Sequence, residues 1–318
     1  MVAISVCIPA YNYGRYLRQT IDSVLAQTWR DFELIVVDNF SNDETADVVR
    51  AAARAYPALR YQRNTEVLGM AANFNCALRL ARGRWVKVLC ADDWLAPDAL
   101  KVSAEAIGCH PNAAMVATGR LLVSEAGDPA ILSHYSGVNG EVRGTEAINR
   151  CLFGTNVIGE PSAVLFRRCF AERGFDEHYR HLVDLEMWFH LLEQGSLVNL
   201  PAPLAMIRRH AAQATRDNAL AGHIITDKKR LYAEYGRRPY VIRAPWQGFR
   251  WRLRTAYNAW GGGRRPRETP AVRASELVHP LIFYPLLPAM MLLERMRDAL
   301  GRWRARRHGR NAPHRGEA

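Results

Sequence analysis

The chain has 318 residues, of which 49% are hydrophobic and 23% charged, and its formal net charge is +12 at pH 7. This composition excludes a disordered or fibrous protein and allows a large buried core. Six cysteines form no C-x-x-C pair and lie mostly in apolar segments, which argues against a zinc site or a disulfide scaffold. No basic flank precedes the short apolar run at the amino terminus, as a secretory signal would require, so we expect a cytoplasmic protein.

The first ninety residues alternate between two hydrophobic periods. Short β-branched runs at residues 3–8, 33–37 and 85–90, and a weaker one at 59–62, alternate with helical spacing at residues 16–29, 44–56 and 70–81. Strands and helices in this order predict an α/β fold with a mostly parallel central sheet and helices on both faces.

Polar or turn-forming residues follow each of the four predicted strands. They read Pro9-Ala10-Tyr11-Asn12, Asp38-Asn39, Arg63-Asn64 and Asp92-Asp93. Ligands of such sheets bind beyond the carboxyl ends of the strands, so we expect one site along this edge. Each position taken alone is equally compatible with a turn or a helix cap, which Asp and Asn also favour. Four strands that end in this way together favour a binding site.

Two absent motifs narrow the kind of site. No G-x-G-x-x-G follows the first strand and no G-x-x-x-x-G-K-[ST] occurs, which disfavours a dinucleotide fold and excludes a P-loop. Asp92 and Asp93 stand side by side, and adjacent carboxylates repel unless a cation or a structural partner holds them. Such a pair binds hard divalent ions like Mg²⁺ or Mn²⁺, which keep open positions for phosphate oxygens. The pair therefore predicts a metal site for a phosphate-bearing ligand.

Several segments together resemble family-2 glycosyltransferases of the GT-A fold. They are SVCIPAYN, LIVVDNFSND, NTEVLGMAANFNCALRLARGRWVKVLCADDWL, and FDEHYRHLVDLEMWFHLLEQG followed by IRRH, in the expected order over roughly residues 3–215. The resemblance implies a GT-A type sheet, a nucleotide-diphosphate-sugar donor (a UDP-sugar first), a Mn²⁺ or Mg²⁺ ion, and transfer with inversion to an acceptor hydroxyl. It also implies a place in bacterial cell-envelope or polysaccharide synthesis.

The resemblance also assigns roles to individual residues. It implies nucleotide-sugar binding by Pro9, Ala10, Tyr11, Asn12, Asp38, Asn73, Asp92 and Arg208, metal binding by Asp93 and His210, and a catalytic base at Asp184. A sugar hydroxyl is a poor nucleophile, so a carboxylate that takes its proton is worth about 10²–10⁴ in rate.

Some of these assignments have open alternatives. Asp184 also suits the start of the helical stretch at residues 187–193, where an acidic residue favours the helix dipole. Glu186 is the rival base, and His210 is as readily a bystander as a ligand. The chain departs from the family pattern at Asn39-Phe40, where Asp-Gly is frequent, at Ala91, where an acidic or small polar residue is frequent, and at Val183, where Glu is frequent.

The resemblance divides the catalytic domain, residues 1–225, into a donor half of about residues 1–110 and an acceptor half of about 111–225. In the second half we expect a strand pair at 113–123 interrupted by Gly119-Arg120, a mobile polar loop at 133–144, and a strand at 163–167. Loops of this kind select acceptors and close over donors.

The remaining residues, 226–318, form a basic tail that we expect to be helical. Residues 228–318 hold 21 Lys and Arg but six Asp and Glu, whereas residues 1–227 hold 22 and 25. Apolar and aromatic residues recur at helical spacing over 246–260 and 292–303 with arginines between them, and the apolar run at 277–293 contains three prolines. This pattern predicts helices that lie on an anionic membrane surface and a peripheral protein on the inner face of the plasma membrane. The acceptor would then be a glycan or lipid-linked. The alternative is that these helices pack on the catalytic domain with their arginines facing water.

Three other functions stay open. A nucleotidyltransferase that makes sugar nucleotides needs a glycine-rich basic loop after the first strand, and AYNYGRYL is not one. A nucleic-acid-binding protein would exploit the basic aromatic tail, but the charge lies outside the predicted core, so we expect no nucleic-acid partner. A catalytically inactive member of the same family would keep binding alone.

Overall fold

The computed structural model describes residues 2–126, 128–135, 139–154, 156–210 and 222–242. The chain divides into two units, Met1–Ile242 and Arg243–Ala318, and every described residue belongs to the first. The helices predicted at 246–260 and 292–303, and the apolar run at 277–293, lie outside the described residues.

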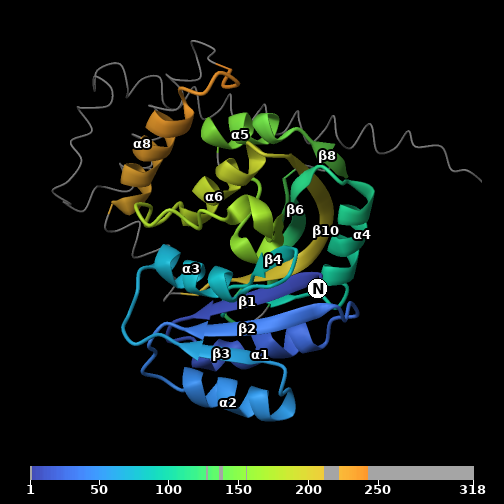
Figure 1. Cartoon of the computed structure of the whole chain (residues 1–318), viewed down its shortest axis with the longest axis vertical. Coiled ribbons are helices and arrows are strands. Elements are labelled where there is room, and N and C mark those ends of the chain that lie inside the picture. Colours follow the sequence, from blue (N-terminus) through green and yellow to red (C-terminus); the bar gives the residue numbers. More distant parts are fainter. Residues whose placement is uncertain (1, 127, 136–138, 155, 211–221, 243–318) are drawn as a thin grey trace, which may run out of the picture. The chain divides into compact units, whose positions relative to one another are not determined.

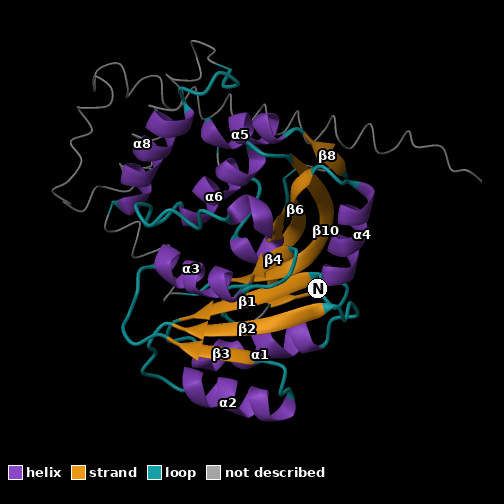
Figure 2. Ribbon diagram, viewed as in Figure 1, coloured by secondary structure: helices purple, strands orange, loops and turns teal. Residues whose placement is uncertain are grey.

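The amino-terminal half has the predicted strand and helix order (Figure 1). Its strands are β1 (Ile4–Ala10), β2 (Phe32–Asp38), β3 (Arg60–Arg63) and β4 (Trp85–Val88), and its helices are α1 (Gly14–Leu25), α2 (Thr45–Ala55) and α3 (Met70–Leu80). The strands are parallel in the order β3-β2-β1-β4, so their carboxyl ends share one edge (Figure 2).

The second half extends this sheet with strands of both directions. β9 (Val164–Arg167) pairs antiparallel with β4 and with β6 (Ala113–Val123), and β6 runs parallel to β10 (Ser196–Arg208). Antiparallel strands complete the sheet: β5 (Trp94–Leu95) and β8 (Gly140–Val142) on β10, and β7 (Pro129–Ser133) on β6. The central sheet is therefore mostly parallel in its first half and mixed in its second.

Helices cover both faces, as predicted for an α/β fold. Besides the first three they are α4 (Ala99–Cys109), α5 (Gly144–Leu152), α6 (Val183–Leu192) and α8 (His223–Tyr235), with 3₁₀ turns at Pro161–Ala163 and Arg168–Ala171. Two buried apolar clusters lie on opposite faces: α1, α2 and α4 contribute to one, and α3, α5, α6 and α8 to the other. The alternating side chains of β1 belong to both clusters, which fixes this strand at the centre of the fold.

The predicted strand pair at 113–123 is wrong, because these residues form the single strand β6. A Cβ atom at Gly119 would lie 2.2 Å from the carbonyl oxygen of Pro201, so the glycine allows β10 to approach β6 closely. The pairing of the two strands shifts register at this place. Gly119 therefore marks an irregularity between neighbouring strands and not a chain reversal.

Helix α8 extends the first unit beyond the expected boundary near residue 225. Leu231 and Tyr235 are buried in the same apolar cluster as α5 and α6. No helix in the described part of the chain is both long and apolar enough to cross a bilayer.

Candidate active site

The loops that follow β1 and β2 are hydrogen-bonded to each other. Ala10 and Asp38 are register partners at the ends of these strands. Beyond them, the Asn12 amide donates to Ser41 Oγ at 2.9 Å, and Asn12 Oδ1 accepts from the Asn42 amide at 3.0 Å. Asn12 takes a φ of 54°, in the left-handed region that Asn tolerates better than most residues. The expected donor loop is thus held by backbone and side-chain contacts.

Asp38 is fully buried, and both of its carboxylate oxygens are engaged. Oδ1 accepts from the Ser41 amide at 2.9 Å, and Oδ2 accepts from the Tyr61 hydroxyl at 3.0 Å and lies 3.4 Å from Arg63 Nε. Tyr11, by contrast, is 45% exposed. At this edge Asp38 therefore shapes the loop, while the Tyr11 ring is open to a ligand.

Asn73 is joined to the end of β2 through a chain of amides. Asn64 Nδ2 donates at 3.0 Å to Oδ1 of both Asn73 and Asn39, and Asn39 Nδ2 donates to the Leu68 carbonyl at 2.9 Å. Asn39 Oδ1 also accepts from the Leu68 amide at 2.9 Å. These buried amides fix the start of α3 against β2, so Asn39, which stands where the family often has Asp, holds the loop before α3.

The two predicted metal-site aspartates lie beyond β4 with a thiol beside them. Cys90 Sγ and one carboxylate oxygen of each of Asp92 and Asp93 all lie within 4.8 Å of one another. Asp93 Oδ2 accepts from the Ser162 hydroxyl at 2.6 Å, and Oδ1 accepts from the Arg208 amide at 3.0 Å. Cys90 lies in an apolar segment of the sequence, and only the folded chain shows that its sulfur lies close to the carboxylates.

Burial dominates the electrostatics of this group. It raises the pKa of Asp93 well above the ordinary range, with the neighbouring Asp92 charge adding to the effect. The pKa of the Cys90 thiol is raised by burial, then by Asp93 and Asp92. On β4, burial lowers the pKa of Lys87 to about 7, against the opposite effect of Asp93. A bound divalent cation would remove the cost of ionising these ligands.

His210 lies against this group but pairs with a single member of it. Its Nε2 is 3.0 Å from Asp92 Oδ2, and its ring packs against Tyr13 and Tyr16 at centroid distances of 5.5 and 5.0 Å. Nδ1 of His210 is buried and has no hydrogen-bond partner among the described residues. A buried nitrogen without a partner is costly unless a ligand completes it.

Arg208 supports the Asp92-Asp93 turn through hydrogen bonds. Its Nε donates to the Asp92 carbonyl at 3.1 Å and its Nη2 to Gln19 Oε1 at 2.6 Å. The guanidinium lies 4.8 Å from the ring centroids of both Tyr16 and Trp94. Because the side chain is 5% exposed, the structure places Arg208 as a support of the aspartates.

Asp184 occupies the first turn of α6 and is partly buried. Its Oδ1 accepts from the Leu185 amide at 2.7 Å, and its Oδ2 from Asn156 Nδ2 at 3.4 Å. Burial raises the pKa of Asp184 to about 7, opposed by the Leu185 amide and assisted by Glu160. The Asp184 charge in turn adds to the raised pKa of Cys90, so the base candidate acts on the same site as the carboxylate pair.

Glu186, the rival base, is held in the interior. It is 1% exposed, receives Arg173 Nη2 at 2.6 and 2.7 Å, and accepts from the Tyr235 hydroxyl at 2.7 Å. Residues two apart on a helix face nearly opposite directions. Glu186 therefore supports α6 from behind, and Asp184 is left as the carboxylate on the side of the site.

Comparison with known proteins decides the family. Residues 5–175, more than half of the chain, match Glycosyl transferase family 2. The chain belongs to this family. This glycosyltransferase is 34% identical over 236 residues to the uncharacterized protein MT1568 of Mycobacterium tuberculosis (strain CDC 1551 / Oshkosh), which covers 68% of the chain and 72% of that protein.

Solved structures show the same fold. Residues 1–349 of S. aureus TarS superpose with a TM-score of 0.62 at 17% identity, covering 86% of this chain and 76% of that one, and the same segment has been solved in complex with UDP-GlcNAc. The mannosyltransferase PcManGT from Pyrobaculum calidifontis, solved in complex with GDP-Man and Mn²⁺, gives 0.58 at 17% identity and covers 91% and 79%. The predicted GT-A type fold and glycosyltransferase activity are confirmed.

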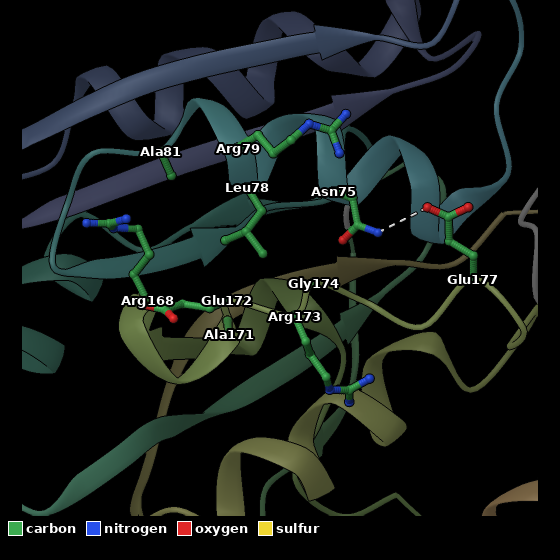
Figure 3. A pocket seen from close by; sticks show the side chains of 10 residues that line it. All are labelled: Asn75, Leu78, Arg79, Ala81, Arg168, Ala171, Glu172, Arg173, Gly174 and Glu177. Atoms are coloured by element: carbon green, nitrogen blue, oxygen red, sulfur yellow. Dashed lines mark hydrogen bonds between the residues drawn. The ribbon is translucent and has the colours of Figure 1, made fainter.

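A hollow of the glycosyltransferase lies between α3 and residues 168–177, and none of the predicted site residues lines it (Figure 3). Asn75 Nδ2 and Glu177 Oε1 close one side of it at 3.3 Å. Its three arginines point away from one another, and each has a protein partner: Arg79 donates to Cys76 Sγ, Arg168 to the Gly83 carbonyl and Arg173 to Glu186. The hollow therefore lacks converging groups that would grip a ligand.

Proposed function

We propose that this glycosyltransferase moves a sugar from a nucleotide-diphosphate sugar to an acceptor hydroxyl with inversion at the anomeric carbon, in cell-envelope or polysaccharide synthesis. The observation that carries the proposal is the group of Cys90, Asp92 and Asp93, whose ligand atoms lie within 4.8 Å of one another beyond β4. Open α/β sheets bind ligands at this edge. Residues 156–162 link the base candidate to this group, because Asn156 donates to Asp184 and Ser162 donates to Asp93.

A UDP-sugar is the proposed donor. The exposed Tyr11 ring offers a face for the base, and aromatic rings stack on bases of any sequence. Pro9, Ala10 and Asn12 would present the rest of the loop, with Asp38 and Asn73 fixing its surroundings through their hydrogen bonds. Asp92 would face the ribose, and Arg208 would hold the Asp92 turn in place. The UDP-GlcNAc complex of a protein with the same fold supports this choice.

The residues present suit a Mn²⁺ or Mg²⁺ ion. Asp93 and His210 would hold it, with Asp92 and Cys90 beside them, because the raised pKa of Asp93 and the unpartnered Nδ1 of His210 both call for a further ligand. Carboxylate oxygens suit both ions, while the thiol favours Mn²⁺ over Mg²⁺. When bound, the ion would offset the negative charge that develops on the leaving diphosphate.

Asp184 would take the proton of the acceptor hydroxyl as the new glycosidic bond forms. A base is most effective when its pKa lies near the working pH, and burial places the pKa of Asp184 at about 7. The Leu185 amide and Asn156 Nδ2 hold the carboxylate in one orientation. Asp184 would therefore accept a proton at neutral pH without large movements of its neighbours.

The acceptor we propose is a glycan or a lipid-linked sugar, reached at the inner face of the plasma membrane. The support is compositional: residues 228–318 hold 21 Lys and Arg against six Asp and Glu. Each basic residue near an anionic leaflet contributes about 1 kcal/mol of attraction. Vesicles containing anionic lipid should sediment the full chain more than a chain ending at Ile242. Equal recovery of both chains in the supernatant would remove the membrane proposal.

A thermal-shift screen tests the donor and the metal together. UDP-glucose, UDP-N-acetylglucosamine and GDP-mannose would each be added with Mn²⁺, with Mg²⁺ and with EDTA, and release of the nucleoside diphosphate would be followed in parallel. We expect a UDP-sugar to raise the Tm only when a divalent ion is present, because ligands that bind the folded state stabilise it. No Tm change in any combination would contradict the proposal. Binding without nucleoside diphosphate release would instead identify an inactive family member.

A further inference from the structure

Asp227 is a buried carboxylate of α8 that the proposed reaction does not use. It is 2% exposed. Its Oδ2 accepts three backbone amides, from Arg180 at 2.9 Å, His181 at 2.6 Å and Leu182 at 2.9 Å. Three consecutive amides converge on one oxygen only when the backbone curls around it, so Asp227 fixes the conformation of residues 180–182.

Residues 180–182 lead directly into α6, whose second residue is Asp184. The amino terminus of α6 has no side-chain cap of its own. The carboxylate of Asp227 supplies charge-assisted hydrogen bonds just ahead of this terminus, where negative charge also favours the helix dipole. Without Asp227, three amides of a turn that is exposed at Arg180 and buried at Leu182 would lose their partner at once.

Helix α8 also contacts α6 at Glu186 and Phe189, which follow Asp184 in the sequence. The Tyr235 hydroxyl donates to Glu186 Oε1 at 2.7 Å, and the Tyr235 ring packs edge-on against Phe189 at a centroid distance of 5.2 Å. In Figure 1, α8 flanks α5 and α6. Asp184 is thus bracketed by one polar anchor two residues before it and another two residues after it, and both come from α8.

We propose that Asp227 is a positioning residue for Asp184: it acts through the amides of residues 180–182 to hold the first turn of α6 at the active site. The proposal rests on the proposed role of Asp184 as the base. The hydrogen bonds of Asp227 go to residues 180–182 and not to the carboxylate pair beyond β4, so it positions the base without binding the donor. A residue more than forty positions beyond the base in the chain would then set how well that base works.

The pH profile separates positioning from plain stability. The charged groups that act on Asp184 are Glu160 and Arg120, and Asp184 itself acts on Cys90. If the first turn of α6 loosens, Asp184 gains water and its pKa falls from about 7 toward the ordinary range. A variant that is only less stable would lose active molecules while the midpoint of its pH profile stays in place.

The experiment compares Asp227→Asn with a matched control, Glu234→Gln. Glu234 is an exposed acidic residue on the same helix that accepts from the Tyr179 hydroxyl at 2.9 Å, while the amides of residues 180–182 bond Asp227. UDP release from UDP-N-acetylglucosamine with Mn²⁺ would be measured from pH 5 to 9. For Asp227→Asn we expect kcat to fall about tenfold or more, a KM for the donor within about twofold, and an acid-limb midpoint at lower pH. Glu234→Gln should match the wild type.

Two further readouts keep the proposal falsifiable. Hydrogen exchange of the amides of residues 180–182 should accelerate in Asp227→Asn, which needs no substrate. If that variant does not fold, Tyr235→Phe should lower the acid-limb midpoint by a smaller amount, because Arg173 still holds Glu186. An unmoved midpoint in the folded variant, or in Tyr235→Phe when Asp227→Asn does not fold, would overturn the proposal. A wild-type profile without an acid limb near pH 7, or an unchanged limb in Asp184→Asn, would instead refute Asp184 as the base.

Discussion

The donor edge and the base helix of this active site are built in different ways. At the donor edge, neighbouring strand ends hold one another, as Asn12 and Ser41 do through a 2.9 Å hydrogen bond. The base helix α6 is held from behind by α8, through Asp227 and Tyr235. The first arrangement follows from strand order, and the second from tertiary packing. Changes at the two places should therefore separate donor binding from proton transfer.

The largest effect should come from Asp184→Asn. We expect kcat to fall about 10²–10⁴-fold, because the amide cannot take the acceptor proton, while donor affinity stays within about twofold. Isothermal titration with the donor and single-turnover kinetics would measure the two quantities. Wild-type turnover would reject Asp184 as the base, and a parallel loss of donor affinity would show that the two parts of the site are not separate.

The same variant makes a stability prediction with a defined sign. Burial raises the pKa of Asp184 to about 7, so its ionised form is disfavoured in the folded state, and the wild type loses stability as the pH rises from about 4 to about 7. At pH 8, Asp184→Asn should be more stable than the wild type by about 2–4 kcal/mol, and at pH 5 by much less. Urea unfolding at both pH values would measure the difference. An equal difference at pH 5 and pH 8 would contradict the raised pKa.

Arg173→Met should weaken the support of α6 without touching the donor edge. It leaves Glu186, which is 1% exposed, with Tyr235 as its remaining partner. A buried carboxylate that loses its cation costs about 2–4 kcal/mol of unfolding free energy. Arg82→Met, an exposed arginine, serves as the control. Denaturant unfolding of both variants tests this, and equal stabilities would mean that the ion pair contributes nothing.

The sequence predicts the donor edge, which depends on strand order, better than the base helix, which depends on tertiary packing. The strands, their polar ends and the pair Asp92 and Asp93 were predictable, because strand periodicity and turn chemistry are local. The thiol of Cys90 in the same group was not, since an apolar segment hides which way one cysteine faces. Asp227 carried no signal, because its partners are backbone amides of residues 180–182, and backbone amides are the same in every sequence.

Arg208 and Gly119 show how much of a residue's surroundings comes from tertiary structure. The resemblance implies nucleotide-sugar binding by Arg208, but no motif contains the partners of its guanidinium, which are Gln19, Tyr16 and Trp94. Gly119 looked like a break between two strands, but it relieves contact with the carbonyl of Pro201 on the neighbouring strand. Both outcomes depend on residues far away in the chain, which no short pattern contains.

A smaller effect is expected from Cys90→Ser, which changes the ligand type at the donor edge. Soft ions gain more from a thiolate than hard ions do, so Cd²⁺ affinity should fall about tenfold or more and Mg²⁺ affinity within about threefold. Calorimetric metal titration measures both, with the exposed Cys109→Ser as the control. Equal losses for the two ions would show that Cys90 is not a ligand.

The smallest effect should come from Phe40, which follows β2 with a φ of 60°. A non-glycine residue in the left-handed region is destabilised by about 1–2 kcal/mol, which explains why the family often has glycine here. Glycine removes this strain, but part of the stabilisation is lost because glycine is more flexible in the unfolded chain. Phe40→Gly should therefore be about 0.5–1 kcal/mol more stable than Phe40→Ala, which keeps the strain. Urea unfolding that ranks the two variants the other way would contradict this account of the turn.

The most direct test of the account is calorimetric binding of UDP-N-acetylglucosamine to the wild type and to Asp93→Ala, each with Mn²⁺ and with EDTA. Asp47→Ala, on the outer helix α2 with a side chain 77% exposed, is the matched control. We predict binding to the wild type and to Asp47→Ala that requires Mn²⁺, and a loss of at least about a hundredfold in Asp93→Ala. Binding that is independent of Mn²⁺, or unchanged in Asp93→Ala, would contradict a donor gripped through a metal ion beyond β4.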